Sequence, residues 1–172
     1  MKTLLIYATI EGQTGKIAEF VSDKIRQAGH EVEMIDANEP SEISFENVDA
    51  VIMAAPVHER RHPENFEALL TAHAGDLGRI KTLLISVSLN AAFPEGREEA
   101  GEYVVEMNMR TGLKPDVELL VAGAVRTDRY DYFAMQVLQH VVLRDRDYVP
   151  KPGGHEFTKW DALSKDIANF LK

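Results

Sequence analysis

The sequence predicts an α/β protein in which helices cover both faces of a parallel sheet. Short runs of apolar residues recur along the chain, as expected of strands buried on both sides, and helical patterns of apolar residues separate them. Strands that alternate with helices favour a doubly wound parallel sheet. The 172 residues have the usual length of one domain, and no linker, repeat or low-complexity segment divides them.

Five segments are expected to form the strands. Four of them are short, nearly continuous apolar runs. The other, residues 31–36, follows the stop signal Gly29-His30 and alternates polar with apolar residues, which indicates a strand at the sheet edge. The expected strands are residues 3–8, 31–36, 48–55, 82–87 and 117–124.

Helical spacing of apolar residues predicts the remaining elements. In the first helix, which starts after Gln13, the apolar positions are Ile17, Val21, Ile25 and Ala28. Later helices are expected over residues 63–74, 94–111, 132–143 and 157–171, the last with Trp160 in the core. The Pro- and acid-rich connection 36–48 is too short for a full helix and is expected to be a loop.

The composition restricts both chemistry and partners. The chain has no cysteine, which excludes disulfides, thiolate metal ligands and cysteine nucleophiles, so redox chemistry needs a bound cofactor. A formal net charge of -9 argues against nucleic acid as a partner, because binding phosphates requires a basic face. Met1 leads directly into a strand and no stretch approaches the roughly 18 apolar residues of a membrane span. A cytoplasmic location is therefore expected.

A hydroxyl- and glycine-rich turn, Thr9-Ile10-Glu11-Gly12-Gln13-Thr14-Gly15, joins the first strand to the first helix. The free N–H groups of such a loop and of the first helical turn, helped by the helix dipole, hold a phosphate without Lys or Arg. Thr9 and Thr14 add hydroxyl donors. The turn lacks the spacing of a Walker loop and of a G-x-G-x-x-G fingerprint. The alternative is a helix start that Gln13 or Thr14 caps, without a ligand.

Four loops are expected to meet around one ligand. In open α/β sheets, ligands bind beyond the carboxyl ends of the strands, where the strand order reverses. A planar ring with polar edges would find stacking and hydrogen-bonding partners among these loops. The loops are residues 9–15, 56–62, 88–97 and 126–131.

Several stretches of the chain resemble one family. They are K-T-L-L-I-Y-A-T-I-E-G-Q-T at the start, S-V-S-L-N-A-A-F-P-E-G-R at 86–97, G-L-K-P-D at 112–116, A-G-A-V-R-T-D-R-Y at 122–130 and T-K-W near Trp160. Together they look like the bacterial flavodoxin-like, menaquinone-dependent protoporphyrinogen IX dehydrogenases. The likeness covers essentially the whole chain.

The resemblance implies a flavodoxin-like, five-stranded parallel sheet in the order 2-1-3-4-5 that binds FMN noncovalently. It also implies a six-electron oxidation of protoporphyrinogen IX, with electrons passed to a membrane quinone, and it assigns no catalytic acid or base. The implied FMN contacts are Thr9, Ile10, Glu11, Gly12, Gln13, Thr14, Pro56, Val57, His58, Ser88, Leu89 and Asn90. The candidate substrate contacts are Arg60, Arg61, Arg126 and Tyr130.

The chain departs from the family in one loop and in charge. The family carries Gly and Tyr where residues 57–62 stand here, and its members look more basic, so another substrate stays open. Two further functions stay open as well. One is a flavodoxin-type electron carrier, whose partner is a redox protein, and the other is a flavin-free interaction domain with the same fold.

Residues 58–62 also read H-E-x-x-H, the zinc-protease signature, which requires both histidines on one helical turn. Pro63 follows directly and biases His62 away from helical geometry, so no metal is expected. Two readings of the segment remain. Arg60 or Arg61 contacts the flavin or a substrate propionate, with bidentate geometry in the second case, or the segment is a solvated polar loop.

The helix expected at residues 132–143 is apolar over more than one face. The favoured interpretation is a helix packed on the sheet, or a dimer surface. The alternative is a surface that meets a quinone or a membrane peripherally, since the helix is too short to span one.

Overall fold

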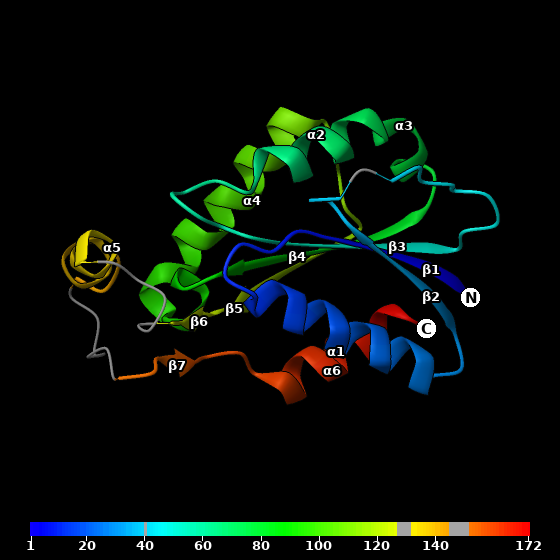
Figure 1. Cartoon of the computed structure of the whole chain (residues 1–172). Helices are drawn as coiled ribbons and strands as arrows, with labels where there is room; N and C mark the ends of the chain where they lie inside the picture. Colours follow the sequence, from blue (N-terminus) through cyan, green and yellow to red (C-terminus); the bar gives the residue numbers. More distant parts are fainter. Residues whose placement is uncertain (40, 127–131, 145–151) are drawn as a thin grey trace.

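The computed structural model describes residues 1–39, 41–126, 132–144 and 152–172, and it contains the expected five-stranded parallel sheet (Figure 1). The strand order is β2-β1-β3-β4-β5, which confirms the prediction. The strands are β1 (Lys2–Tyr7), β2 (Glu31–Asp36), β3 (Ala50–Pro56), β4 (Lys81–Ser88) and β5 (Val117–Ala122).

Burial follows the position of each strand in the sheet. The central strands β3 and β4 are buried almost throughout, whereas β2 lies at the edge and alternates, as its sequence predicts. The carboxyl ends of the strands are level, since Tyr7 lies opposite both Asp36 and Ala54, and Pro56 lies opposite Val87. The strand order reverses between β1 and β3, and a ligand is therefore expected above these two ends.

Helices form a layer on each face of the sheet (Figure 1). α1 (Gln13–Gln27) and α6 (Trp160–Phe170) pack on one face. α2 (Glu64–Ala72), α3 (Ala74–Leu77) and α4 (Arg97–Thr111) pack on the other, each face having its own hydrophobic core. Ile17, Val21 and Ile25 face the sheet as predicted, but Ala28 follows the end of α1 and is exposed.

Other boundaries differ by a few residues from the expected ones. The 3-10 turns η1 (Asn90–Ala92) and η2 (Pro94–Gly96) precede α4, and the described parts of the connection 36–48 form a loop. Trp160 is partly buried: it packs against the core beneath α1, with its ring 4.8 Å from that of Phe20. Within the described ranges, no helix is both long enough and apolar enough to cross a membrane.

The chain leaves the sheet at Gly123, so the strand expected over 117–124 is wrong at its end. Gly123 donates its N–H to the Ser88 carbonyl at 3.2 Å and accepts the Phe157 N–H at 3.0 Å. β6 (Ala124–Val125) then pairs antiparallel with β7 (His155–Glu156). We call residues 123–157, which leave the sheet after β5 and return through β7, the excursion. A Cβ at position 123 would lie 3.3 Å from the Val87 side chain, so glycine suits the crossing.

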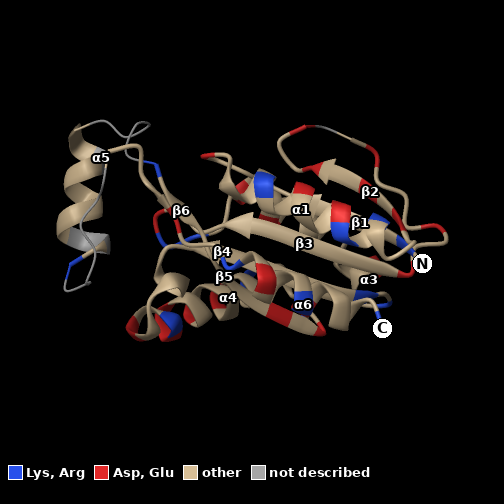
Figure 2. Cartoon of the chain, turned by 90° about the horizontal axis from the view of Figure 1, so that it is seen from below, with Lys and Arg blue, Asp and Glu red and all other residues tan. Residues whose placement is uncertain are grey.

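The helix predicted over 132–143 forms as α5 (Tyr132–Val137) followed by a π-helical turn, η4 (Leu138–Val142). The expectation that it covers the sheet is wrong. α5 lies beyond the carboxyl ends of the strands, on the side opposite the N-terminus (Figures 1 and 2). Leu138 of η4 and the following Leu143 pack with Val125 of β6 and with loop residues, apart from the two cores on the faces of the five-stranded sheet.

Candidate ligand-binding site

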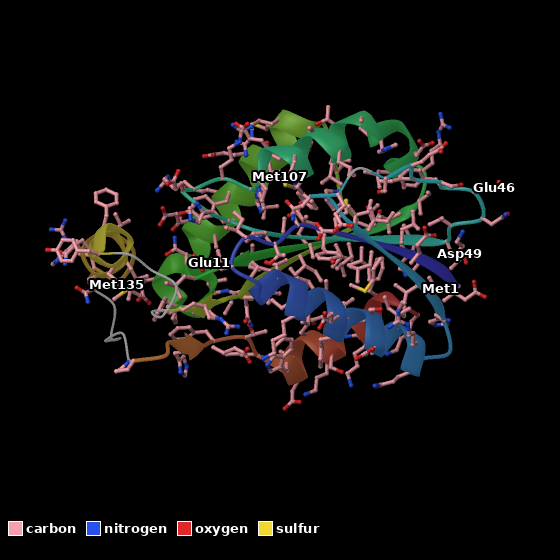
Figure 3. The ribbon with its side chains drawn as sticks, in the orientation of Figure 1. Met1, Glu11, Glu46, Asp49, Met107 and Met135 are labelled. Atoms are coloured by element: carbon pink, nitrogen blue, oxygen red, sulfur yellow. The ribbon has the colours of Figure 1, made fainter. Side chains whose placement is uncertain are left out.

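A cavity of about 420 Å³ opens where the strand order reverses. Figure 3 labels Glu11, which lines the cavity from the first loop, and Met135, which lies on α5. Ten of the twelve predicted FMN contacts line the cavity, and so does Arg60, which the sequence assigns to a substrate. These residues are Ile10, Glu11, Gln13, Thr14, Pro56, Val57, His58, Ser88, Leu89 and Asn90, with Arg60 as the eleventh.

The first loop has the geometry of an anion-binding turn. Gly12 adopts a left-handed conformation, with φ 95°, and its N–H donates to Thr9 Oγ1 at 3.0 Å. The first intrahelical bond joins the Lys16 N–H to the Gly12 carbonyl, so the amides of residues 13–15 precede it. The first turn contains no acidic residue. These amides and the helix dipole favour a phosphate here.

The capping expected of Gln13 or Thr14 is wrong, because Gly12 is the N-cap of α1 and no side chain caps it. The Gln13 amide is buried and donates instead to Glu156 at 3.1 Å and to Thr158 at 3.0 Å. Arg126 donates to Gln13 Oε1 at 2.9 Å. The structure therefore places Arg126 beside the first loop and outside the cavity lining.

Glu156 ties the returning strand to α1. It accepts bonds from Lys16 at 2.6 Å, from Trp160 Nε1 at 2.8 Å and from Gln13. Burial alone would raise the pKa of Glu156, but these three donors together lower it below its usual value. The carboxylate thus stays charged and holds β7 against the phosphate-type loop.

A two-residue hairpin turn forms the second loop. His58 and Arg61 exchange both backbone hydrogen bonds, at 2.9 and 3.1 Å, while Glu59 and Arg60 between them have φ 50° and 66°. Left-handed conformations cost non-glycine residues about 1–2 kcal/mol each. The segment is not helical, and His62 is buried with Nε2 2.9 Å from Ser86 Oγ. The zinc-protease reading is therefore excluded, and no group of metal ligands occurs among the described residues.

The hairpin sends its two arginines in different directions. Arg61 pairs with Glu64 at 3.2 Å and with the buried Glu67 at 3.1 Å, and it does not line the cavity. Arg110 donates to both oxygens of Glu67, at 2.7 and 3.0 Å. Arg60 faces the cavity instead, where it pairs with Glu99 and lies 5.5 Å from the centre of the Tyr103 ring.

Glu99 and Tyr103, on α4, are functional candidates that the sequence analysis missed. Tyr103 donates to Glu99 Oε1 at 2.8 Å, and Asn90 donates to Glu99 Oε2 and to the Tyr103 hydroxyl, both at 3.0 Å. Burial, with the Glu99 hydrogen bond, raises the pKa of Tyr103 to about 12, so the phenol stays neutral. Their spacing of four along a helix was a visible signal, but only the fold brings them to Asn90.

The excursion supplies an apolar wall that the sequence analysis did not assign to the cavity. Phe133, Val137 and Leu138 line it from α5 and η4, and Gly123 and Ala124 line it from the start of the excursion. Phe133 is 75% exposed, so the wall continues to the surface. Tyr130, the remaining predicted contact, lies outside the described residues. One polar and one apolar wall together suit a flat ring with polar edges.

The fold and the site define a class of protein: an open, doubly wound α/β domain with a ligand cavity at its topological switch point and an anion-binding turn at the first helix. A family model described as Flavodoxin domain matches residues 4–148. The chain belongs to this flavodoxin family.

Similarity to individual proteins extends over the full chain. Protoporphyrinogen IX dehydrogenase [quinone] of Escherichia coli K12 is 26% identical over 176 aligned residues, which cover 100% of this chain and 93% of that protein. Oxidised flavodoxin 1 of Bacillus cereus superposes with a TM-score of 0.60 at 18% identity, covering 99% of this chain and 97% of that one. A Lactobacillus acidophilus flavoprotein in complex with FMN gives a TM-score of 0.53 at 17% identity, covering 69% and 92%.

Proposed function

We propose that this protein is an FMN-dependent oxidoreductase that oxidises protoporphyrinogen IX and passes the electrons to a quinone. The observation that carries the proposal is the full-length similarity to a quinone-dependent protoporphyrinogen IX dehydrogenase. The cavity supports it, because an anion-binding turn and a half-apolar, half-polar ring site lie in one place.

The residues around the cavity fit FMN. The phosphate would bind the turn Thr9–Thr14, where Gly12 turns the backbone and the buried Thr14 offers a hydroxyl. The ring would lie against the loops Pro56–His58 and Ser88–Asn90. The Val57 N–H donates to the Val87 carbonyl at 2.8 Å, which ties the second loop to the end of β4. Within the loop that follows β4, the Ala91 N–H donates to Ser88 Oγ at 3.2 Å.

When bound, FMN supplies the hydride and electron chemistry, and the protein supplies placement and electrostatics. The chain's own contribution would be a polar group, Asn90, and an apolar wall of Phe133 and Val137, all three of which line the cavity. Tyr103 stays protonated at physiological pH and serves as a neutral hydrogen-bonding group.

A flavodoxin-type electron carrier is the second candidate, favoured by the structural likeness to flavodoxins and by the acidic charge of the chain.

We also propose that residues 1–172 form one domain, since both cores share one sheet. For a quinone acceptor we propose peripheral membrane contact through Tyr132 and Phe133, both largely exposed.

The first test is the visible absorbance of the purified protein, followed by reconstitution with FMN and identification of the released ligand. Stoichiometric FMN is expected, followed by turnover of protoporphyrinogen IX with a menaquinone analogue. Flavin binding without turnover would favour the carrier. Absence of any flavin binding would contradict both redox functions and favour an interaction domain.

A further inference from the structure

We propose that Arg60 is the specificity-determining residue for a ligand that carries a carboxylate, and that Glu99 holds Arg60 in place until the ligand's carboxylate replaces it. The proposal rests on the proposed function, whose substrate has propionate groups. It adds to that function a named recognition residue and a resident competitor.

Arg60 is the one cationic side chain that the structure places in the lining of the cavity, as far as the chain is described. The other two arginines considered from the sequence have partners elsewhere. Arg61 binds Glu64 and the buried Glu67, and Arg126 binds Gln13. Recognition of an acidic ligand inside this cavity therefore falls to Arg60, whose planar guanidinium suits a carboxylate.

The pair between Arg60 and Glu99 is suited to exchange. The Arg60 side chain is 65% exposed and that of Glu99 is 34% exposed, so water screens their attraction. When Arg60 moves, each Glu99 oxygen keeps a donor: Tyr103 at Oε1 and Asn90 at Oε2. No buried carboxylate oxygen loses its last hydrogen bond, which is the usual obstacle to breaking such a pair.

Arg60 is also held in place without Glu99. Its backbone lies in the hairpin turn, which is closed by two hydrogen bonds between His58 and Arg61. Its guanidinium lies over the ring of Tyr103, which is itself buried. Because a cation is attracted to a ring face anywhere within about 6 Å of its centre, the guanidinium can turn from Glu99 to a ligand while it stays near the ring.

The test compares two porphyrins that differ only in charge: protoporphyrin IX and its dimethyl ester. Both are titrated against the FMN-reconstituted protein, with porphyrin fluorescence as the readout. Arg60→Gln is expected to weaken binding of the diacid about tenfold, as for loss of a charged hydrogen bond, and to leave the ester unchanged. Glu99→Gln is expected to tighten binding of the diacid about threefold, because the competitor is removed.

Matched controls change the same net charge at exposed positions outside the cavity. Glu98→Gln neutralises the residue next to Glu99, and Arg79→Gln removes a distant cation; both are expected to leave either affinity within about twofold. FMN affinity and the thermal midpoint of each variant are measured alongside, so that a folding defect is recognised. A low midpoint in Glu99→Gln leaves Arg60→Gln to decide the test.

Three results would overturn the proposal: equal loss of diacid and ester in Arg60→Gln, weaker diacid binding in a stably folded Glu99→Gln, or no preference of the unaltered protein for the diacid. Failure of the proposed function looks different. There the unaltered protein does not oxidise protoporphyrinogen IX, while the diacid preference and its dependence on Arg60 persist.

Discussion

Gly12 adopts a left-handed backbone conformation at the point where a phosphate would meet α1. Gly12→Val is expected to weaken FMN binding about tenfold, because a β-branched residue resists this conformation. Thr14→Val, which removes only a hydroxyl, is expected to have a similar effect. Gly29→Val is the matched control: Gly29 has φ 81° beyond the other end of the same helix, so strain there lowers stability without touching the loop. Unchanged FMN affinity in both loop variants, measured by flavin fluorescence, would contradict the phosphate site.

His62 is a second residue with a measurable consequence, since burial lowers its pKa from 6.5 to about 4. The unfolded chain therefore binds more protons than the folded one between these values. The contribution of His62 to the free energy of unfolding is fully present above pH 6.5. It falls by up to about 1.4 kcal/mol for each pH unit as the pH drops from 6.5 to about 4. His62→Gln is expected to flatten this slope in urea titrations at pH 7 and pH 5, whereas the exposed His140→Gln keeps it. A slope equal in all three proteins would contradict this assignment.

Glu67 lies buried between two arginines, and their hydrogen bonds lower its pKa although burial alone would raise it. Glu67→Gln is expected to lower the free energy of unfolding by about 2 kcal/mol, less than for a fully buried pair because Arg61 and Arg110 are partly exposed. Because the lowered pKa stabilises the folded state above the usual carboxyl range, the difference from the unaltered protein shrinks as the pH falls through that range. Glu64→Gln, on the exposed partner of Arg61, is expected to cost less than about 0.5 kcal/mol.

At the scale of elements, buried apolar runs predict the strands, and helical spacing predicts α1, α2, α4 and α6 within a few residues. The break after β5 was not predictable, because residues 117–124 read as one apolar run. The break depends on pairing with His155 and Glu156, about thirty residues later. The Gln13 side chain was not predictable for the same reason, because it donates to Glu156 of β7. The position expected for α5 was wrong because an apolar helix packs equally well on a sheet or on loops. The sequence of the helix does not distinguish these two positions.

Thr158, which follows β7, connects the end of β5 to the start of α1: it donates to the Ala122 carbonyl at 2.7 Å and accepts from Gln13 at 3.0 Å. Thr158→Val removes the donor to the Ala122 carbonyl and leaves the Gln13 amide with Glu156 as its acceptor, so it is expected to cost about 1–2 kcal/mol. Hydrogen exchange should accelerate in β6 and β7 and remain slow in β1. Uniform acceleration across the sheet would instead show that the excursion does not open as a separate unit.

At the scale of the whole molecule, charge separates the two redox candidates. Acidic residues are spread over the helices and loops around the sheet (Figure 2), and the net charge is -9. The long-range field of such a molecule attracts a basic redox protein and repels a substrate with two carboxylates. Salt screens this field beyond a distance of about 10 Å at 0.1 M, while a direct contact with Arg60 acts over a shorter distance.

The two candidates therefore differ in the sign of their response to salt. For the proposed dehydrogenase, raising NaCl from about 0.05 to 0.5 M should lower the KM for protoporphyrinogen IX or leave it within about twofold. For an electron carrier, the same change should raise the KM for a basic partner protein severalfold. Steady-state assays with an uncharged quinone as acceptor provide the comparison, because the quinone itself does not respond to the field. A KM for protoporphyrinogen IX that rises steeply with salt would mean that local cations, and not the overall charge, govern its approach to the cavity.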